Sequence, residues 1–234
     1  SVLGVLSELT YSHSSGFYDE PSMFIGITSN DDNVNIYYTL DGSEPSTDSH
    51  LYSGPIFLQE NKVIRAASFK DGWLKSPIKT STFILDNENY DFPTIFLSTA
   101  PENFFDYYTG IYVMGPNASS DFPHFGANFW EDWERPVYME ILEPDGTYFE
   151  SPAGAKIFGG WSRGQAQKSL SIFARGEYGA QEFDYPIFPD LDIDSYQSFV
   201  LRNSGNDWSF TMLRDGYMTG LFDNIDLDHQ AYRP

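Results

Sequence analysis

Residues 159–170 read GGWSRGQAQKSL and indicate most clearly how this chain folds. The stretch predicts the end of one strand, a flexible glycine loop, and a second strand that opens on Lys168. Glycine lets a backbone approach a ligand closely, and a lysine at the start of a packed strand can reach phosphate oxygens. The spacing matches neither G-x-x-x-x-G-K-[ST] nor G-x-G-x-x-G, so the standard nucleotide motifs do not apply.

Strands are predicted over 153–158 and 168–175, on either side of this loop. Side chains alternate between the two faces of a strand, so Lys168 shares a face with Leu170 and Ile172. The pattern therefore predicts that Lys168 points toward the buried side of the sheet. A strand-end lysine that extends its ammonium group into solvent fits the same residues, and both interpretations stay open.

Composition excludes several classes of function. The 234 residues include 34 Asp and Glu but only 13 Lys and Arg, which gives a net charge of −21. Such a surface repels phosphate backbones and anionic lipids, so we expect no nucleic-acid binding. No apolar run approaches the roughly 20 residues of a membrane helix, so we expect no membrane insertion. The chain has no Cys, and its four His residues lack ligand spacing, so no metal site is predicted.

The first 85 residues predict short strands separated by turns. Apolar and polar residues alternate over 34–40, and Asp71-Gly72 is typical of a tight hairpin. Strands at this spacing predict an immunoglobulin-like sandwich. Residues 36–46 (IYYTLDGSEPS), with the later matches at 52, 54–56 and 64–66, resemble the chitobiase/β-hexosaminidase C-terminal-type module. The resemblance implies a small accessory β-sandwich without catalytic residues.

An acidic, turn-prone segment over 86–91 follows, so the predicted domains are residues 1–88 and 89–234. In the second domain, strands over 135–142 and 147–150 flank a Pro-Asp-Gly turn. A further strand is predicted over 198–203. Asn206 and Asp207 are predicted to cap a helix after it, because apolar residues recur at spacings of three and four: Phe210, Leu213, Tyr217 and Leu221.

A series of short fragments in the second domain follows one order along the chain. They are 92–93 (FP), 110–113 (GIYV), 128–130 (NFW), 133–137 (WERPV), 159–160 (GG), 162–163 (SR), 168–170 (KSL), 178–179 (YG), 185–188 (YPIF), 201–208 (LRNSGNDW), 214–215 (RD) and 230–234 (QAYRP). This ordered series resembles the beginning of the CotH (spore coat protein H) kinase family. The two resemblances imply a mainly β chain, in which an immunoglobulin-like β-sandwich precedes the truncated, β-rich α+β N-lobe of an atypical kinase-like domain.

The kinase resemblance implies transfer of phosphate from ATP to Ser or Thr of an extracytoplasmic protein, by a secreted or surface-associated bacterial protein. The family's catalytic and metal-binding acidic motifs lie beyond the last residue, so no catalytic residue is assigned. Phosphoryl transfer needs such carboxylates to hold magnesium. We therefore expect this segment alone to be inactive, with ATP and Mg²⁺ as cofactors only where the full kinase domain is present.

Four residues are candidates for nucleotide binding. Lys168 is the candidate phosphate ligand, and the resemblance implies that Asp215 could orient it. Arg163 could clamp phosphate through two N–H groups, or pair with a surface acid. Ser162 could donate to phosphate, or cap the loop. For Asp215 the alternative is a helix-surface carboxylate that pairs with Arg214 or faces solvent.

The rival hypothesis is a non-enzymatic module that binds carbohydrate or protein in a bacterial surface assembly. In that case exposed Trp130, Trp133 and Trp161 would stack on a sugar or a partner. Burial of the three rings in a core is the alternative. The partners expected from the two hypotheses are ATP with a protein substrate, or a surface-assembly partner.

Overall fold

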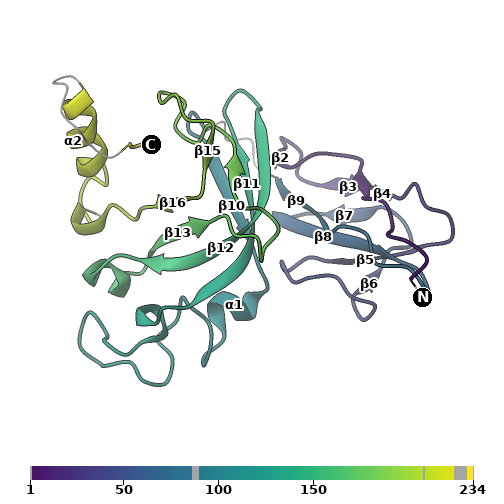
Figure 1. Ribbon diagram of the computed structural model, residues 1–234, viewed down its shortest axis with the longest axis horizontal. Coiled ribbons are helices and arrows are strands. Elements are labelled where there is room, and N and C mark those ends of the chain that lie inside the picture. Colours follow the sequence, from purple (N-terminus) through teal and green to yellow (C-terminus); the bar gives the residue numbers. More distant parts are fainter. Residues whose placement is uncertain (1, 86–89, 208, 224–230, 234) are drawn as a thin grey trace. The chain divides into compact units, whose positions relative to one another are not determined.

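The computed structural model describes residues 2–85, 90–207, 209–223 and 231–233 (Figure 1). The chain is mainly β, as predicted. By contacts it divides into two compact units, one of Ser1–Pro101 with Leu142–Thr147, the other of Glu102–Ile141 with Tyr148–Pro234. The predicted boundary between residues 88 and 89 lies outside the described residues and stays a prediction. No helix in the described ranges is long and apolar enough to cross a membrane.

The first unit contains a five-stranded sheet. Its strands lie in the order β2 (Gly16–Phe17), β9 (Lys79–Ile84), β8 (Lys62–Phe69), β5 (Asn35–Thr39) and β6 (His50–Leu51). β2 runs parallel to β9, and the other neighbours are antiparallel. The apolar face predicted for β5 contributes to the core, with Ile36 buried and Tyr38 packed against it, but Thr39 of the predicted polar face is buried as well.

Two pairs of short strands complete this unit: β3 (Met23–Ile25) with β7 (Ile56–Leu58), and β1 (Thr10–Tyr11) with β4 (Ile27–Thr28). Ile25 and Leu58 from the short strands share one apolar core with Ile64 and Phe83 from the large sheet. The shared core means that sheets pack face to face, which is the predicted β-sandwich. Strand β10 (Thr94–Ser98) also lies in the first unit.

The second unit contains strands β11 (Glu134–Leu142), β12 (Tyr148–Phe158), β13 (Ser169–Phe173) and β16 (Ser198–Leu201), which follow one another in one sheet (Figure 1). β13 is antiparallel to both of its neighbours. Short elements fill the connections: α1 (Pro101–Phe105), η1 (Asn128–Trp130), η2 (Trp161–Gly164), β14 (Phe183–Asp184), β15 (Ser195–Tyr196) and η3 (Gly205–Asp207). A last helix, α2, spans Arg214–Asp223.

Two predicted boundaries differ from the structure. The strands predicted over 147–150 and 153–158 form the single strand β12, which continues through Pro152. The helix predicted to follow Asp207 begins only at Arg214, because Met212 has a φ of 61° and interrupts it. Asp207 still caps α2, since its Oδ2 accepts a hydrogen bond from the Arg214 N–H at 3.1 Å.

Candidate functional site around Lys168

The glycine loop folds back on the segment before the sheet through Arg163. Its Nε donates to the Gly159 carbonyl at 2.6 Å, and its Nη1 donates to the Phe129 carbonyl at 3.1 Å. The guanidinium also lies 5.5 Å from the centre of the Trp130 ring. Burial lowers the pKa of Arg163, although the Asp132 carboxylate opposes this effect. Arg163 therefore holds the loop against η1 through carbonyl groups.

Lys168 lies at the entry to β13 with only 9% of its surface exposed. Its Nζ donates to the Gln165 carbonyl at 2.7 Å, and it lies 4.3 Å from the Phe129 ring centre and 5.1 Å from that of Tyr112. The Lys168 side chain is thus buried, as the strand parity predicts. Among the described residues no carboxylate pairs with its ammonium group, and burial lowers the pKa of Lys168.

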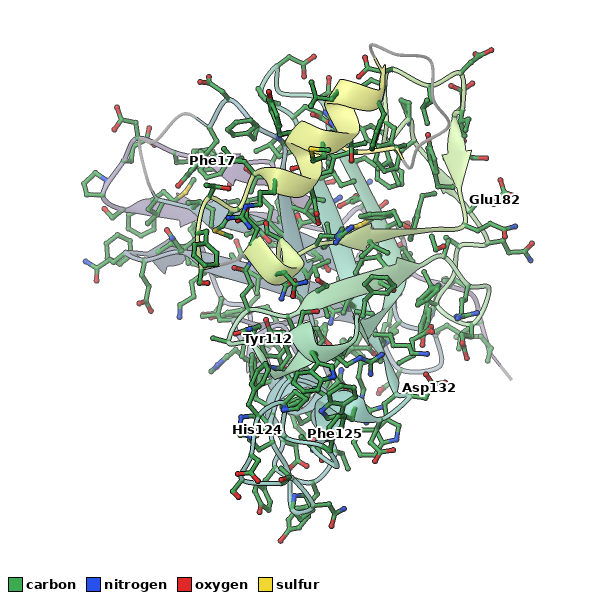
Figure 2. The ribbon with its side chains drawn as sticks, turned by 90° about the vertical axis from the view of Figure 1, so that its left-hand side faces the viewer. Phe17, Tyr112, His124, Phe125, Asp132 and Glu182 are labelled. Carbon is green, nitrogen blue, oxygen red and sulfur yellow. The ribbon has the colours of Figure 1, made fainter. Side chains whose placement is uncertain are left out.

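Tyr112 also contacts Lys168, and it comes from a distant segment of the chain. Its hydroxyl accepts a hydrogen bond from the Lys168 backbone N–H at 2.8 Å. Its ring stacks on Phe104 of α1 with an interplanar angle of 4°. Tyr112 and Phe125, both labelled in Figure 2, contact the loop through Lys168 and Trp161 respectively. The ammonium of Lys168 is therefore enclosed by rings and one carbonyl.

Asn203 fixes the other end of the loop. It is 2% exposed, and its Nδ2 donates to the Gln167 carbonyl at 2.7 Å. Its Oδ1 accepts from the Ser169 hydroxyl at 2.9 Å, and its backbone N–H donates to the same hydroxyl at 3.0 Å. Oδ1 also accepts from the Gly205 N–H at 3.1 Å, so Asn203 forms a local turn, but its partners in the loop lie more than 30 positions away along the chain.

The four predicted nucleotide-binding residues do not form one cluster. Lys168, Arg163 and Ser162 belong to one loop, and the half-buried Ser162 accepts a hydrogen bond from the Gln165 N–H through its carbonyl at 3.1 Å. Asp215 instead pairs with Arg202, with 2.6 Å between Oδ2 and Nη2. Arg214, the alternative partner of Asp215, pairs with Asp207 at 3.0 Å. The binding roles of these residues stay predictions.

An exposed aromatic surface lies at the same loop. Phe122, Phe125 and Trp161 are 48%, 54% and 63% exposed, and we call them the aromatic platform. The Trp161 ring meets Phe122 at 6.0 Å and Phe125 at 6.3 Å, in both cases edge to face. Sequence reasoning named Trp161 but missed the two Phe residues. Their position in the turn-rich stretch 121–126 was the signal that could have identified them.

The other two tryptophans are less available. Trp130 is half-buried, with its Nε1 bonded to the Pro123 carbonyl at 2.9 Å. Trp133 is also half-buried and lies under the Arg135 guanidinium, 5.2 Å from the ring centre. Within the described ranges, no group of three or more His, Cys, Asp or Glu side chains is placed to hold a metal ion.

Comparison with family models gives this geometry a context. Residues 155–234 match the CotH kinase protein family. This CotH-matching segment contains the loop, Lys168, Asn203 and α2, and it confirms the resemblance identified from the sequence. Residues 25–83 match the Fn3 associated family, which agrees with a sandwich module before the CotH-matching segment. The fragments between 92 and 154 lie outside both matches. No curated protein matches the chain.

Proposed function

We propose that the CotH-matching segment provides the nucleotide-covering side of an atypical protein kinase, which transfers phosphate from ATP to Ser or Thr of an extracytoplasmic protein. The observation that carries the proposal is the environment of Lys168. This residue lies in a segment that matches a kinase family, beside a glycine loop, and its ammonium group is buried without a carboxylate among the described residues.

The chemistry of a buried ammonium supports anion binding. An ammonium group has three N–H donors, and one bonds to the Gln165 carbonyl. Burial without a countercharge destabilises the charged form, as the lowered pKa of Lys168 indicates. A phosphate oxygen close to Nζ would stabilise that form. Lys168 directly precedes β13, and in protein kinases the lysine that contacts the phosphates lies on a strand of the nucleotide lobe.

The remaining candidates take supporting roles in this proposal. Arg163 closes the loop through the carbonyls of Gly159 and Phe129, so we assign it the positioning of the loop over phosphate. Ser162 lies in the same turn and is the candidate hydroxyl donor. Asp215 stays a prediction, because its observed partner is Arg202. ATP with Mg²⁺ is the proposed cofactor, supported by the family match alone.

The proposed location is the bacterial cell surface or the secreted fraction. The support is the Fn3-associated match over residues 25–83, since such a module is suited to an extracellular protein. The proposed partner is accordingly a protein substrate outside the cytoplasm.

Thermal unfolding of the 234-residue chain with and without Mg·ATP tests the nucleotide site. We expect ATP to raise the melting temperature and Lys168→Met to abolish this shift. Lys156→Met is the matched control, because Lys156 is also in the CotH-matching segment but already pairs with Asp132. An equal ATP shift in wild type and Lys168→Met would contradict the role of Lys168. If ATP shifts the melting temperature of none of the three proteins, nucleotide binding by the chain would be contradicted.

The aromatic platform favours a second candidate, the non-enzymatic binding module. Three exposed rings at one site offer stacking faces to a sugar or a partner protein. Here the expected result is a glycan-array signal that is lost in Trp161→Ala and is insensitive to ATP. Loss of the ATP shift in Lys168→Met, with no glycan signal, would reject this candidate.

A further inference from the structure

Two aromatic rings lie beside the Lys168 ammonium group. Its Nζ is 4.3 Å from the centre of the Phe129 ring and 5.1 Å from that of the Tyr112 ring. The same Nζ donates a hydrogen bond to the Gln165 carbonyl at 2.7 Å. A cation within about 6 Å of a ring centre is attracted by the negative face of the ring. Both rings therefore stabilise the charged form of this buried side chain.

A carboxylate is the ordinary partner of such a lysine. In protein kinases the phosphate-binding lysine pairs with a glutamate, and the sequence suggested Asp215 for this role. Asp215 instead pairs with Arg202, with 2.6 Å between Oδ2 and Nη2. Within the described part of the chain no carboxylate pairs with Lys168, and burial lowers its pKa. The favourable electrostatic contacts of its ammonium group are thus one carbonyl and two ring faces.

Tyr112 contacts Lys168 through two different groups. Its ring lies beside Nζ, and its hydroxyl accepts a hydrogen bond from the Lys168 backbone N–H at 2.8 Å. The two residues are 56 positions apart along the chain. The hydroxyl therefore fixes the backbone from which the side chain starts, and the ring attracts the charge at its other end.

Phe104 of α1 holds Tyr112 in turn. The two rings are stacked, with centres 6.0 Å apart and an interplanar angle of 4°. The Tyr112 N–H also donates to the Phe104 carbonyl at 2.9 Å. Both the backbone and the ring of Tyr112 are thereby fixed by one buried residue.

The second ring is fixed as well, and it is tied to the first. Phe129 is buried, and its carbonyl accepts from Arg163 Nη1 at 3.1 Å. The preceding residue, Asn128, is also buried, and its Nδ2 donates to the Gly110 carbonyl at 3.1 Å. Gly110 lies two positions before Tyr112. Asn128 thus connects the two segments that carry the rings, so their arrangement is set before any ligand binds.

We propose that Tyr112 is the positioning residue for Lys168, and that its ring, with that of Phe129, does for the ammonium group what a glutamate does in ordinary kinases. A ring face attracts the ammonium group but carries no net charge, so the positive charge stays available to a phosphate oxygen. The role rests on the proposed function, because a positioned ammonium group matters where an anion binds it.

The pKa of Lys168 in the whole chain without nucleotide, measured by NMR with ¹³C-lysine, tests the role of the ring. Tyr112→Leu should lower this pKa further, because a ring that stabilises the charged form is lost. Tyr112→Phe should leave it unchanged. Tyr108→Leu is the matched control, since Tyr108 is 68% exposed and its ring contacts that of Tyr107. An unchanged pKa of Lys168 in Tyr112→Leu would overturn the proposal, and so would a rise, because the ring would then only exclude water.

Tyr112→Phe keeps the test decisive if Tyr112→Leu does not fold. It retains the ring and removes only the acceptor of the Lys168 N–H, so it should lower the free energy of unfolding without moving the pKa of Lys168. In both wild type and Tyr112→Phe the protons next to Nζ should resonate upfield, because they lie beside ring faces. A shifted pKa in Tyr112→Phe, or protons at ordinary positions in wild type, would contradict the arrangement.

Titration with Mg·ATP tests the consequence for binding. Tyr112→Leu should weaken binding about fivefold, because a lysine side chain that is no longer held must be ordered when the phosphates bind. Tyr112→Phe and Tyr108→Leu should bind as the wild type does. Equal affinity in Tyr112→Leu and wild type would overturn the positioning role. If Mg·ATP binds to none of these proteins, the proposed function fails, whereas the pKa comparison without nucleotide still decides whether Tyr112 holds the ammonium group.

Discussion

Among the residues that the structure describes, each unit buries one cation to the same extent, but the two are held in different ways. Arg65 in the first unit and Lys168 in the second are both 9% exposed. Arg65 donates to the Thr80 hydroxyl at 3.3 Å and to the Gly42 carbonyl at 2.8 Å, so it ties a neighbouring strand to a turn. Lys168 bonds to one carbonyl and is otherwise enclosed by the rings of Phe129 and Tyr112.

The difference separates a structural cation from a functional candidate. A guanidinium that bridges the sheet and a left-handed turn, with Gly42 at a φ of 85°, contributes to the fold itself. An ammonium between rings, with a lowered pKa, is less stable in its charged form and gains more from an added anion. Equal burial therefore does not imply equal roles, and substitution of the two residues should distinguish them.

The largest expected effect comes from the pair Arg65→Met and Lys168→Met. Arg65→Met should lower the free energy of unfolding by about 3 kcal/mol, because the Gly42 carbonyl and the Thr80 hydroxyl each lose a buried partner. Lys168→Met should change it by no more than about 1 kcal/mol, since the cost of burying a charge disappears with the hydrogen bond. Denaturant unfolding measures both, and equal losses would show that Lys168 is structural too.

Asn203→Ala should have the next largest effect. We expect a loss of about 2.5 kcal/mol, because the part-buried Gln167 carbonyl would lose its donor and the buried Ser169 hydroxyl would lose its acceptor, although the backbone N–H of residue 203 still reaches that hydroxyl. Asn206→Ala is the control, since Asn206 is exposed and should change stability by less than about 0.5 kcal/mol. Similar values for the two variants would mean that the loop before β13 is not held by Asn203.

Gly164→Ala tests how closely the loop packs. A Cβ at this position would lie 2.7 Å from Phe122 Cε2 and 3.1 Å from Pro123 Cα. Overpacking should cost about 1.5 kcal/mol and disturb the aromatic platform, seen as a change in tryptophan fluorescence. Gly54→Ala, with nothing within 4 Å of its added Cβ, should be silent. An undisturbed Gly164→Ala protein would show that η2 does not depend on this contact.

The smallest expected effect concerns Tyr178 at alkaline pH. Burial, followed by the charge and hydrogen bond of Glu134, raises the pKa of Tyr178 to about 12. The folded chain therefore retains a proton that the unfolded chain loses near pH 10. Stability from this group is fully present below pH 10 and decreases as the pH rises toward 12. Tyr178→Phe should flatten the dependence in that window, and an unchanged slope would contradict the assignment.

Local patterns in the sequence predicted the features that depend on neighbouring residues. Alternation predicted the buried face of β5, and strand parity predicted the burial of Lys168. The Pro144-Asp145-Gly146 turn was also predicted, because a glycine with positive φ is the expected solution there. The β-sandwich follows from such strands and turns alone.

Features that depend on distant residues were not predicted. Asn203 donates a hydrogen bond to the Gln167 carbonyl, 36 positions away along the chain, and no periodic pattern in the sequence indicates such a pair. The predicted start of α2 was wrong, because the spacing of apolar residues does not reveal that Met212 adopts a left-handed backbone conformation. Phe210, Leu213 and Tyr217, which set that spacing, are between 64% and 71% exposed, so they do not form a buried helix face within the described residues. The partner of Asp215 was likewise set by the fold, which places Arg202 beside it.

The pKa of Lys168, measured by NMR on chain labelled with ¹³C-lysine, tests the central claim most directly. Without nucleotide, burial should hold the pKa of Lys168 below the ordinary value of a lysine. Addition of Mg·ATP should raise the pKa of this one lysine, because phosphate oxygens stabilise its charged form. A pKa that starts at the ordinary value and does not respond to nucleotide would contradict the account.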